Sequence, residues 1–196
     1  MLKRILALSV VFLLASSVAY ATVVRNRVTI KGSDTMVIMV QRLAEEYMGK
    51  FRGKVIQVSG GGSGVGIAAL INKTTDIANA SRQIKDSERN AIKKAWGKDP
   101  REFKVALDGI TIYVHPDNPV KDLTLAQLKD IFTGKITSWK EFGWEDKPII
   151  VYTRENSSGT YVFFKEHVLL NQDYTRSAQS MPGTASVVNA VSQEKY

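Results

Sequence analysis

Short runs of β-branched and apolar residues alternate with segments of helical periodicity along most of this chain. The expected strands are residues 28–31, 55–59, 76–80, 103–115 and 149–152, and the expected helices are residues 37–51, 64–72, 86–96 and 125–132. This alternation is typical of an α/β protein, in which helices pack on a mostly parallel sheet. The run 103–115 is interrupted by Asp108 and Gly109, which suits a strand that passes between two lobes.

The first 21 residues have the features of a secretory signal peptide. Lys3 and Arg4 precede an apolar run over residues 5–15, and Ala19-Tyr20-Ala21 places small residues at a cleavage site. We therefore expect a mature chain that starts near Thr22, lies in the periplasm and is not inserted in the membrane. The sequence contains no cysteine, which excludes disulfides, thiolate metal sites and a lipid-anchor cysteine.

The charge of the chain is moderately basic. The 27 lysines and arginines outnumber the 19 acidic residues, and without Lys3 and Arg4 the count is 25 against 19, a net charge of +6. The basic residues are scattered, and no aromatic ladder lies between them. This pattern argues against a nucleic-acid partner, although a positive field would help to gather small anions.

Four short polar turns follow expected strands, and three of them lead directly into expected helices. They are Gly-Ser-Asp-Thr-Met at 32–36, Gly-Gly-Gly-Ser-Gly at 60–64, Ala-Ser-Arg at 80–82 and Arg-Glu-Asn-Ser-Ser-Gly-Thr at 154–160. A helix N-terminus exposes unpaired backbone N–H groups and the positive end of the helix dipole. In an open α/β sheet, such turns gather at the carboxyl ends of the strands, where ligands bind.

Each turn alone reads as an ordinary helix cap, but four together favour an oxyanion site. Arg154 strengthens this interpretation, because a guanidinium beside a Ser-Gly-Thr helix start supplies a permanent charge with a planar fork suited to oxyanions. The alternatives are that Arg154 pairs on the surface with Glu155 or Glu166, and that Arg82 is the cationic ligand.

The parts that an enzyme would need are missing from the sequence. The glycine cluster at 60–66 lacks the ending of a nucleotide P-loop and the spacing of a dinucleotide fingerprint. The two histidines, His115 and His167, are isolated. We therefore predict no catalytic residues, no metal and no cofactor. The alternative from another class is an exported phosphate-ester hydrolase that uses Ser63 or Ser158 as its nucleophile.

Seven short motifs occur in the order found in one known family. They are Gly-Ser-Asp-Thr at 32–35, Gly-Gly-Ser-Gly-x-Gly at 61–66, Asp-Ile-Ala-x-Ala-Ser-Arg at 76–82, Leu-Asp-Gly-Ile at 107–110, Asn-Pro-Val at 118–120, Ile-Phe-Thr-Gly-Lys-Ile-Thr-x-Trp at 131–139 and Arg-Glu-x-Ser-Ser-Gly-Thr at 154–160. In these motifs the chain resembles the phosphate-binding proteins of ABC-type phosphate importers. The resemblance runs from about Val28 to the end of the chain.

The resemblance implies a type II periplasmic-binding-protein fold, with two α/β lobes that are joined by a hinge and close over a dehydrated anion. The expected division is a signal peptide at 1–21, a first lobe at 22–108 and a second lobe at 109–196. The family's chains continue beyond the equivalent of Tyr196, so we expect both lobes to lack a C-terminal part. Uncovered strand edges would then favour association.

The resemblance also implies a ligand, a partner and a set of phosphate-binding residues. The ligand would be inorganic phosphate, which is captured between the lobes and delivered to the membrane permease of an ABC importer. The residues that match the family's ligands are Ser33, Thr35, Met36 through its backbone N–H, Ser63, Ser81, Arg154, Ser158, Gly159 and Thr160.

One departure from the family leaves the choice of oxyanion open. Some members have an aspartate, which accepts the proton of hydrogen phosphate, where this chain has Ser81. The alternative ligands are therefore sulfate, molybdate and tungstate. Asp34 could restore selectivity if its carboxylate faces the cleft, but its position slightly favours a helix cap; in that case Asp108 or another group would have to select the anion.

Overall fold

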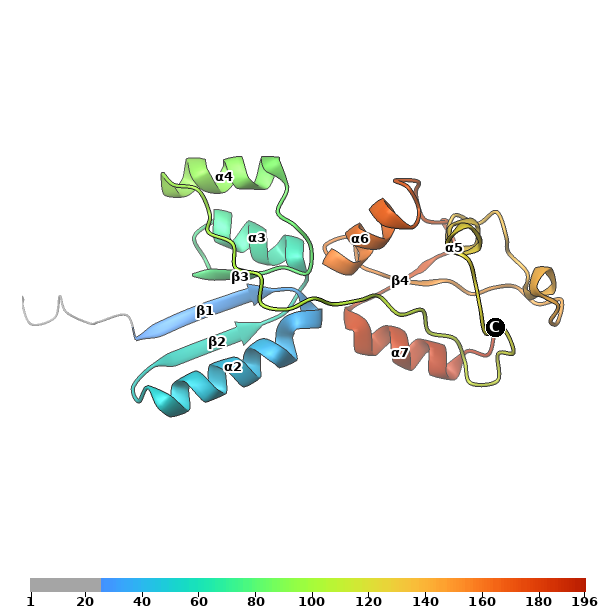
Figure 1. Cartoon of the computed structure of the whole chain (residues 1–196), viewed down its shortest axis with the longest axis horizontal. Coiled ribbons are helices and arrows are strands. Elements are labelled where there is room, and N and C mark those ends of the chain that lie inside the picture. Colours follow the sequence, from blue (N-terminus) through green and yellow to red (C-terminus); the bar gives the residue numbers. More distant parts are fainter. Residues whose placement is uncertain (1–25) are drawn as a thin grey trace, which may run out of the picture.

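The computed structural model describes residues 26–196 as two lobes arranged side by side along the long axis of the molecule (Figure 1). The signal peptide expected at residues 1–21 lies outside the described residues. The first lobe runs from β1 to α4, and the second runs from α5 to α7. Between them, residues 97–124 cross from one lobe to the other.

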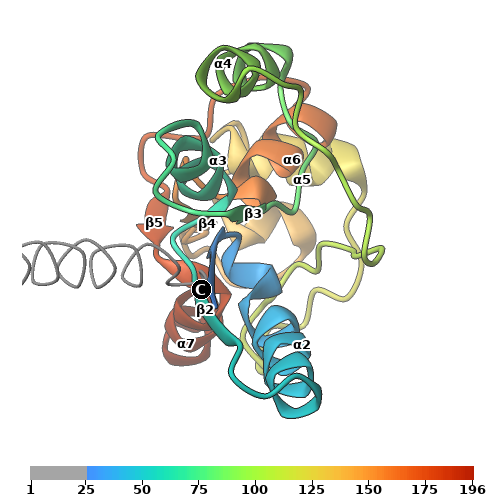
Figure 2. The same ribbon diagram turned by 90° about the vertical axis from the view of Figure 1, so that its left-hand side faces the viewer.

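The first lobe is built on a three-stranded parallel sheet. Its elements are β1 (Arg27–Gly32), the short 3-10 helix η2 (Asp34–Met36), α2 (Val37–Lys50), β2 (Val55–Ser59), α3 (Ser63–Ile71), β3 (Ile77–Asn79) and α4 (Asp86–Trp96). The strand order is β2-β1-β3, with Thr29 opposite Gln57 and Lys31 opposite Ala78. Figure 2 shows α2 and α3 on opposite sides of these strands, as in an α/β sheet covered on both faces.

The second lobe has a smaller sheet and more irregular chain. Its elements are α5 (Leu125–Phe132), the 3-10 helix η3 (Trp139–Phe142), β4 (Tyr152–Arg154), α6 (Gly159–His167), β5 (Gln179–Met181) and α7 (Gly183–Gln193). β4 and β5 are parallel, and Arg154 lies opposite Met181. The buried apolar side chains of this lobe are Leu128, Ile131, Trp139, Val151, Phe164 and Leu169.

The prediction of an α/β fold with parallel strands is confirmed, and several elements match closely. β2 and α4 have the expected bounds, and β1, α3 and β3 differ from expectation by one residue at each end. Thr124 caps α5 as expected, since its side chain accepts a hydrogen bond from the Gln127 N–H. The helix expected at 37–51 begins with the turn η2 and buries only Val40 and Ala44 of its apolar face.

The strand expected at 103–115 does not form. Residues 101–114 cross between the lobes in no regular secondary structure, and none of their backbone groups bonds to another segment among the described residues. These residues have the composition of a strand, but a strand forms only when it pairs with another strand. No described strand lies in register beside this segment.

The strand expected at 149–152 is shifted to Tyr152–Arg154. Residues 148 and 149 bond instead to the segment before η3: Pro148 bridges to Ser138, and the Ile149 N–H donates to the Thr137 carbonyl. The pairing with β5 can therefore start only after this contact ends, which moves the strand toward Arg154.

Candidate functional site

The four polar turns meet where the two lobes face each other. Three follow β1, β2 and β3, whose parallel pairing brings their carboxyl ends to one edge of the sheet. The fourth follows β4 of the second lobe. In Figure 1, β1 and β2 point toward the second lobe, so these turns lie between the lobes.

Four hydroxyl groups from the first lobe form one hydrogen-bonded cluster. Ser33 Oγ lies 2.7 Å from Thr35 Oγ1 and donates to Ser81 Oγ at 2.9 Å. Ser81 Oγ lies 3.3 Å from Ser63 Oγ, which also accepts the Ser81 N–H at 3.1 Å. Ser33 and Ser63 are buried, Ser81 is half-buried and Thr35 is exposed. Four of the predicted ligand residues are thus brought together.

The start of α6 faces this hydroxyl cluster from the other lobe. A Cβ added at Gly159 would overlap the hydroxyl oxygens of Ser63 and Ser81, so only glycine permits this approach. Ser158 is buried, and its Oγ accepts the Tyr161 N–H at 3.4 Å. The N–H groups of Gly159 and Thr160 belong to the first turn and have no carbonyl of their own helix to bond. They are therefore available to an anion.

Arg154 provides a buried cation at the same place. Its side chain is 6% exposed; Nη2 donates to Asp34 Oδ2 at 2.9 Å, and Nη1 donates to Thr184 Oγ1 at 3.0 Å. Its Nε is buried and has no hydrogen-bond partner in the described part of the chain. Because a guanidinium carries five N–H donors, Nε–H and one N–H on each terminal nitrogen remain for a ligand.

Asp34 does not cap a helix, which corrects the slight preference drawn from the sequence. Its Oδ1 accepts the Gly61 N–H at 2.8 Å, while Oδ2 accepts from Arg154. The short helix η2 receives no side-chain cap from its own N-cap residue, Ser33. The carboxylate therefore joins two turns of the first lobe to the cation of the second.

Backbone contacts also join the lobes beside the site. The Gly64 N–H donates to the Ser157 carbonyl at 2.9 Å, and Ser157 Oγ lies 3.4 Å from the Gly61 carbonyl oxygen. A Cβ at Gly62 would come within 2.8 Å of Ser157. The glycines of the second turn thus let the two backbones touch.

Arg82, the alternative cation, is committed to another partner. Its two terminal nitrogens donate to both carboxylate oxygens of Glu88, at 2.8 and 2.6 Å. Burial raises the pKa of Glu88, but hydrogen bonds from Arg82 and from the Lys85 N–H outweigh it and hold the pKa below its usual value. The pair secures the third turn against the start of α4. Arg82 Nε, like Arg154 Nε, is buried without a partner among the described residues. Because both terminal nitrogens of Arg82 bond to one carboxylate, whereas Arg154 bonds to Asp34 through a single nitrogen, Arg154 is the better placed of the two arginines.

The remaining predicted residues lie at the edge of the site. The Met36 N–H already donates to the Ser33 carbonyl at 3.2 Å, and Thr160 is half-buried beside the second-lobe cavity. Sequence reasoning missed Thr184, which is the second residue of α7 and accepts a hydrogen bond from Arg154. Its signal was a fifth strand-to-helix turn, Met-Pro-Gly-Thr at 181–184, after a strand too short and too polar to be recognised.

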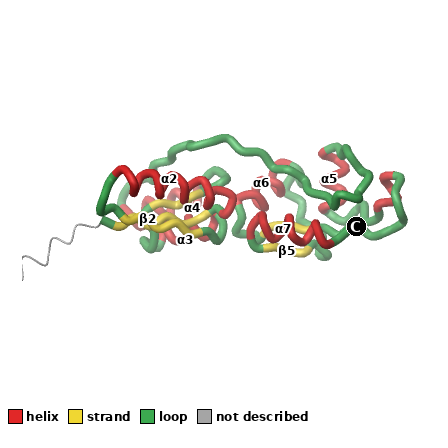
Figure 3. Tube along the Cα trace, turned by 90° about the horizontal axis from the view of Figure 1, so that it is seen from below, coloured by secondary structure: helices red, strands yellow, loops and turns green. Residues whose placement is uncertain are grey.

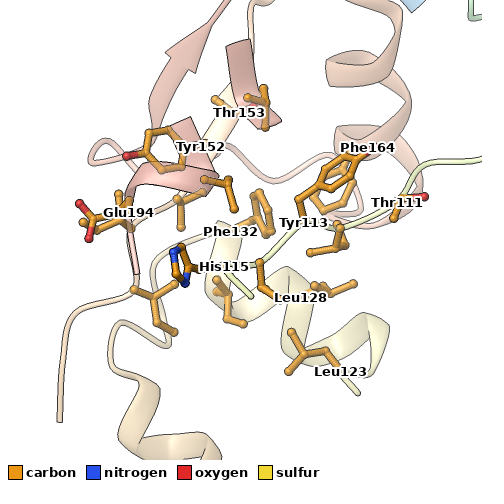
Figure 4. A pocket seen from close by; sticks show the side chains of 18 of the residues that line it. Thr111, Tyr113, His115, Leu123, Leu128, Phe132, Tyr152, Thr153, Phe164 and Glu194 are labelled. Atoms are coloured by element: carbon orange, nitrogen blue, oxygen red, sulfur yellow. The ribbon is translucent and has the colours of Figure 1, made fainter. Parts of the chain in front are cut away.

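The second lobe also has a partly open cavity of about 170 Å³, whose lining includes Arg154, Thr160 and Thr184 of the site. Figure 4 shows Tyr113, Leu128, Phe132 and Phe164 pointing into it, with His115 and Glu194 on one side. Most of its lining is aliphatic or aromatic. A dehydrated anion needs many donors, and these walls offer few, so the cavity does not suit an oxyanion.

The described residues hold no arrangement that resembles a hydrolytic centre. His115 Nδ1 accepts the Asp117 N–H at 3.1 Å, and His167 Nδ1 lies 3.0 Å from the Phe163 carbonyl oxygen, so neither ring contacts Ser63 or Ser158. Residues 26–196 contain no group of three histidine, aspartate or glutamate side chains placed to hold a metal ion. Within that range no helix has the length and apolar character to cross a membrane.

Comparison with known proteins gives relatives over most of the chain. A family model described as a PBP superfamily domain matches residues 17–196. The phosphate-binding protein PstS of Pseudomonas aeruginosa is 36% identical over 174 residues, which cover 83% of this chain and 54% of the relative. The phosphate-binding protein PstS of Staphylococcus epidermidis is 38% identical over 168 residues, which cover 84% of this chain and 51% of the relative. The chain thus spans about half the length of these relatives.

Two solved structures are also similar. One is a putative phosphate ABC transporter substrate-binding protein with bound phosphate from Clostridium perfringens, with a TM-score of 0.79 and 37% identity over 86% of this chain and 67% of that one. The other is an ABC-type phosphate transport receptor from Vibrio cholerae, with a TM-score of 0.64 and 31% identity. The match covers 86% of this chain and 68% of that one.

Proposed function

The chain belongs to the PBP superfamily, and from that premise we propose that it captures inorganic phosphate between its two lobes and delivers it to an ABC-type importer. The names of the similar proteins support this proposal, since they include phosphate-binding proteins and one structure with bound phosphate. The proposed ligand residues are those expected from the sequence, with Asp34 added, and Thr184 is proposed to position Arg154.

The observation that carries the proposal is the set of donors around Arg154. Three of its N–H groups, four neighbouring hydroxyls and the free N–H groups at the start of α6 converge from both lobes. A dehydrated phosphate needs this number of donors and a compensating positive charge, because each oxygen that loses water must gain a hydrogen bond.

Asp34 supports phosphate over sulfate as the ligand. Hydrogen phosphate carries a proton that a carboxylate can accept, whereas sulfate near neutral pH carries none and would meet an unpaired like charge. The carboxylate of Asp34 lies 2.9 Å from Arg154 Nη2, so it borders the place where the anion would bind. We propose that it replaces the acceptor that Ser81 cannot fully provide.

The same geometry argues against the alternatives. Sulfate, molybdate and tungstate would each approach the Asp34 carboxylate without a proton to share. A phosphate-ester hydrolase would need a base beside Ser63 or Ser158, but Ser63 bonds to Ser81, and Ser158 bonds to the start of its own helix. We therefore propose that the chain binds its anion without transforming it.

Delivery of phosphate to the importer would depend on the phosphate-binding residues being divided between the two lobes. Phosphate would join Arg154 and α6 to the hydroxyls of the first lobe, so that binding favours the closed arrangement that a membrane permease could recognise. This role requires export, which we propose is directed by residues 1–21 to the periplasm.

Isothermal titration calorimetry with phosphate and sulfate tests the proposal. We expect saturable binding of one phosphate per chain, and sulfate binding weaker by at least about tenfold. No heat with phosphate, or equal affinity for both anions, would contradict the proposed function. A phosphatase assay with and without divalent metal separates the hydrolase alternative.

A further inference from the structure

Arg82 keeps one edge of its guanidinium unused although its side chain is only 7% exposed. Nη1 donates to the Gln83 carbonyl at 2.9 Å and to Glu88 Oε2 at 2.8 Å, and Nη2 donates to Glu88 Oε1 at 2.6 Å. Nε is buried and has no partner in the described part of the chain. Of the five N–H donors of the guanidinium, Nε–H and one N–H of Nη2 are therefore without a partner among residues 26–196.

These two donors form a fork of their own. Glu88, in the first turn of α4, binds the end of the guanidinium between Nη1 and Nη2, and α4 packs beside α3 (Figure 3). The remaining N–H of Nη2 lies on the same edge as Nε–H and parallel to it, because Nη1 is the terminal nitrogen on the side of Cδ. Two parallel N–H groups on a planar cation match the oxygens of a carboxylate or a phosphate.

The unused edge of Arg82 lies beside the hydroxyl cluster. Arg82 follows Ser81, whose hydroxyl lies 3.3 Å from Ser63 Oγ and whose N–H donates to it. Nη2 is 3.9 Å from the position of a Cβ added at Gly64, the residue after Ser63, and the Ser157 carbonyl oxygen is 3.3 Å from the same position. The two donors are thus placed where the turns of the two lobes meet.

The Nε–H of Arg82 can be satisfied only by a small partner. The described residues already enclose this nitrogen, so a further stretch of chain could not reach it without displacing them. An anion or a water molecule can enter when the lobes separate and be enclosed when they close. An oxyanion satisfies the fork better than water, because it accepts both N–H groups and balances part of the positive charge.

We propose that Arg82 is a second cationic ligand of the anion site, and that its Nε–Nη2 edge donates to the oxygens of phosphate. This role rests on the proposed function and deepens it, since Arg154 remains the main cation. Glu88 balances the charge of the buried guanidinium but occupies only the end away from Nε, so the pair can be buried and still serve an anion. Two arginine forks favour an anion that offers several charged oxygens.

Calorimetric titration with inorganic phosphate of Arg82→Gln and Glu88→Gln tests the proposal, because each variant removes one half of the same ion pair. An arginine that only supports the fold would make the two variants alike. We expect Arg82→Gln to weaken phosphate binding by at least about tenfold. Glu88→Gln should weaken it by no more than about threefold, because its amide oxygen can still accept a hydrogen bond from Arg82.

Two further variants separate the fork from the charge. Arg82→Lys keeps the charge but lacks the two parallel donors, so it should also lose at least about fivefold in affinity. Arg42→Gln is the matched control, because it removes the same charge from an exposed arginine of α2 that pairs with Glu45. Its affinity for phosphate should equal that of the wild type. Thermal unfolding of each variant identifies the temperatures at which all of them are folded.

The proposal fails if Arg82→Gln binds phosphate as tightly as Arg42→Gln, because the edge would then hold only water. It also fails if Arg82→Gln and Glu88→Gln lose the same affinity, since the pair would then act through the fold alone. Wild-type affinity in Arg82→Lys excludes the fork, and this variant decides the matter if Arg82→Gln does not fold. A wild-type protein that binds no phosphate contradicts the proposed function and, with it, the role of Arg82.

Discussion

Asp34 and Arg154 form a 2.9 Å ion pair that joins the first turn of the first lobe to the turn after β4 in the second. The arginine side chain is 6% exposed and the aspartate side chain 24%. A buried cation must have its charge balanced and its N–H groups hydrogen-bonded. Asp34 meets these needs only in part, since Nε has no partner among the described residues. The pair therefore orients Arg154 while leaving donors for an anion.

Replacing Arg154 with alanine should weaken phosphate binding by about 3 kcal/mol or more, the usual scale for removing one member of a buried charge-assisted pair. Arg154→Lys keeps the charge but loses the planar fork, so its loss should be intermediate. Calorimetric titration measures both. A loss below about tenfold for Arg154→Ala, roughly 1.4 kcal/mol, would mean that Arg154 is not the main cationic ligand.

Gly159→Ala should weaken phosphate binding by at least about tenfold, because the added methyl group would collide with the hydroxyls of Ser63 and Ser81 and hold the lobes apart. The matched control is Gly49→Ala. That glycine lies in α2 with no atom near its added Cβ, so the variant should bind normally and gain up to about 1 kcal/mol in stability. Equal affinities for the two variants would show that the start of α6 does not approach the ligand.

Thr184→Val should weaken phosphate binding by about 1 kcal/mol, since it removes a hydroxyl that accepts from Arg154 and keeps the shape of the side chain. Thr160→Val, at the start of α6, makes the same substitution at another threonine of the site, and its phosphate affinity is compared with that of Thr184→Val. If Thr184→Val leaves the affinity unchanged, Thr184 does not position the guanidinium.

The arrangement of the candidate site was largely predictable from the sequence because the motifs that form it are local. A strand followed by a polar turn and a helix start is visible in a few residues, and parallel pairing then brings such turns together. Ser33, Ser63, Ser81 and Arg154 could be found this way. Thr184 could not, because β5 is a short strand of Gln-Ser-Met without β-branched residues.

The fold was less predictable where tertiary contacts decide the conformation. The run 103–115 has the composition of a strand but finds no neighbour among the described residues. The orientation of Asp34 was also undecided, since an aspartate before a helix can cap it or reach another turn. Only the approach of Gly61 and Arg154 selects the second arrangement.

The stability of the folded chain should fall at acidic pH because Glu88 becomes protonated there. Its pKa in the folded chain lies below the usual 4.5, so its ion pair with Arg82 contributes stability above that value and loses it as the pH falls below. Glu88→Gln should lower the melting temperature at neutral pH and flatten its decline toward about pH 3. Thermal unfolding across this range measures both. An identical pH dependence in the two proteins would contradict the role of the pair.

The most direct test of the account is a pair of titrations, phosphate and sulfate, on the wild-type protein and on Asp34→Asn. The wild type should bind phosphate at least about tenfold more tightly than sulfate. Because the amide removes the negative charge and leaves a weaker hydrogen-bond acceptor, Asp34→Asn should narrow that ratio by weakening phosphate binding, strengthening sulfate binding or both. A wild type that binds neither anion, or a ratio that Asp34→Asn leaves unchanged, would contradict a site in which Arg154 supplies the charge and Asp34 selects the protonated anion.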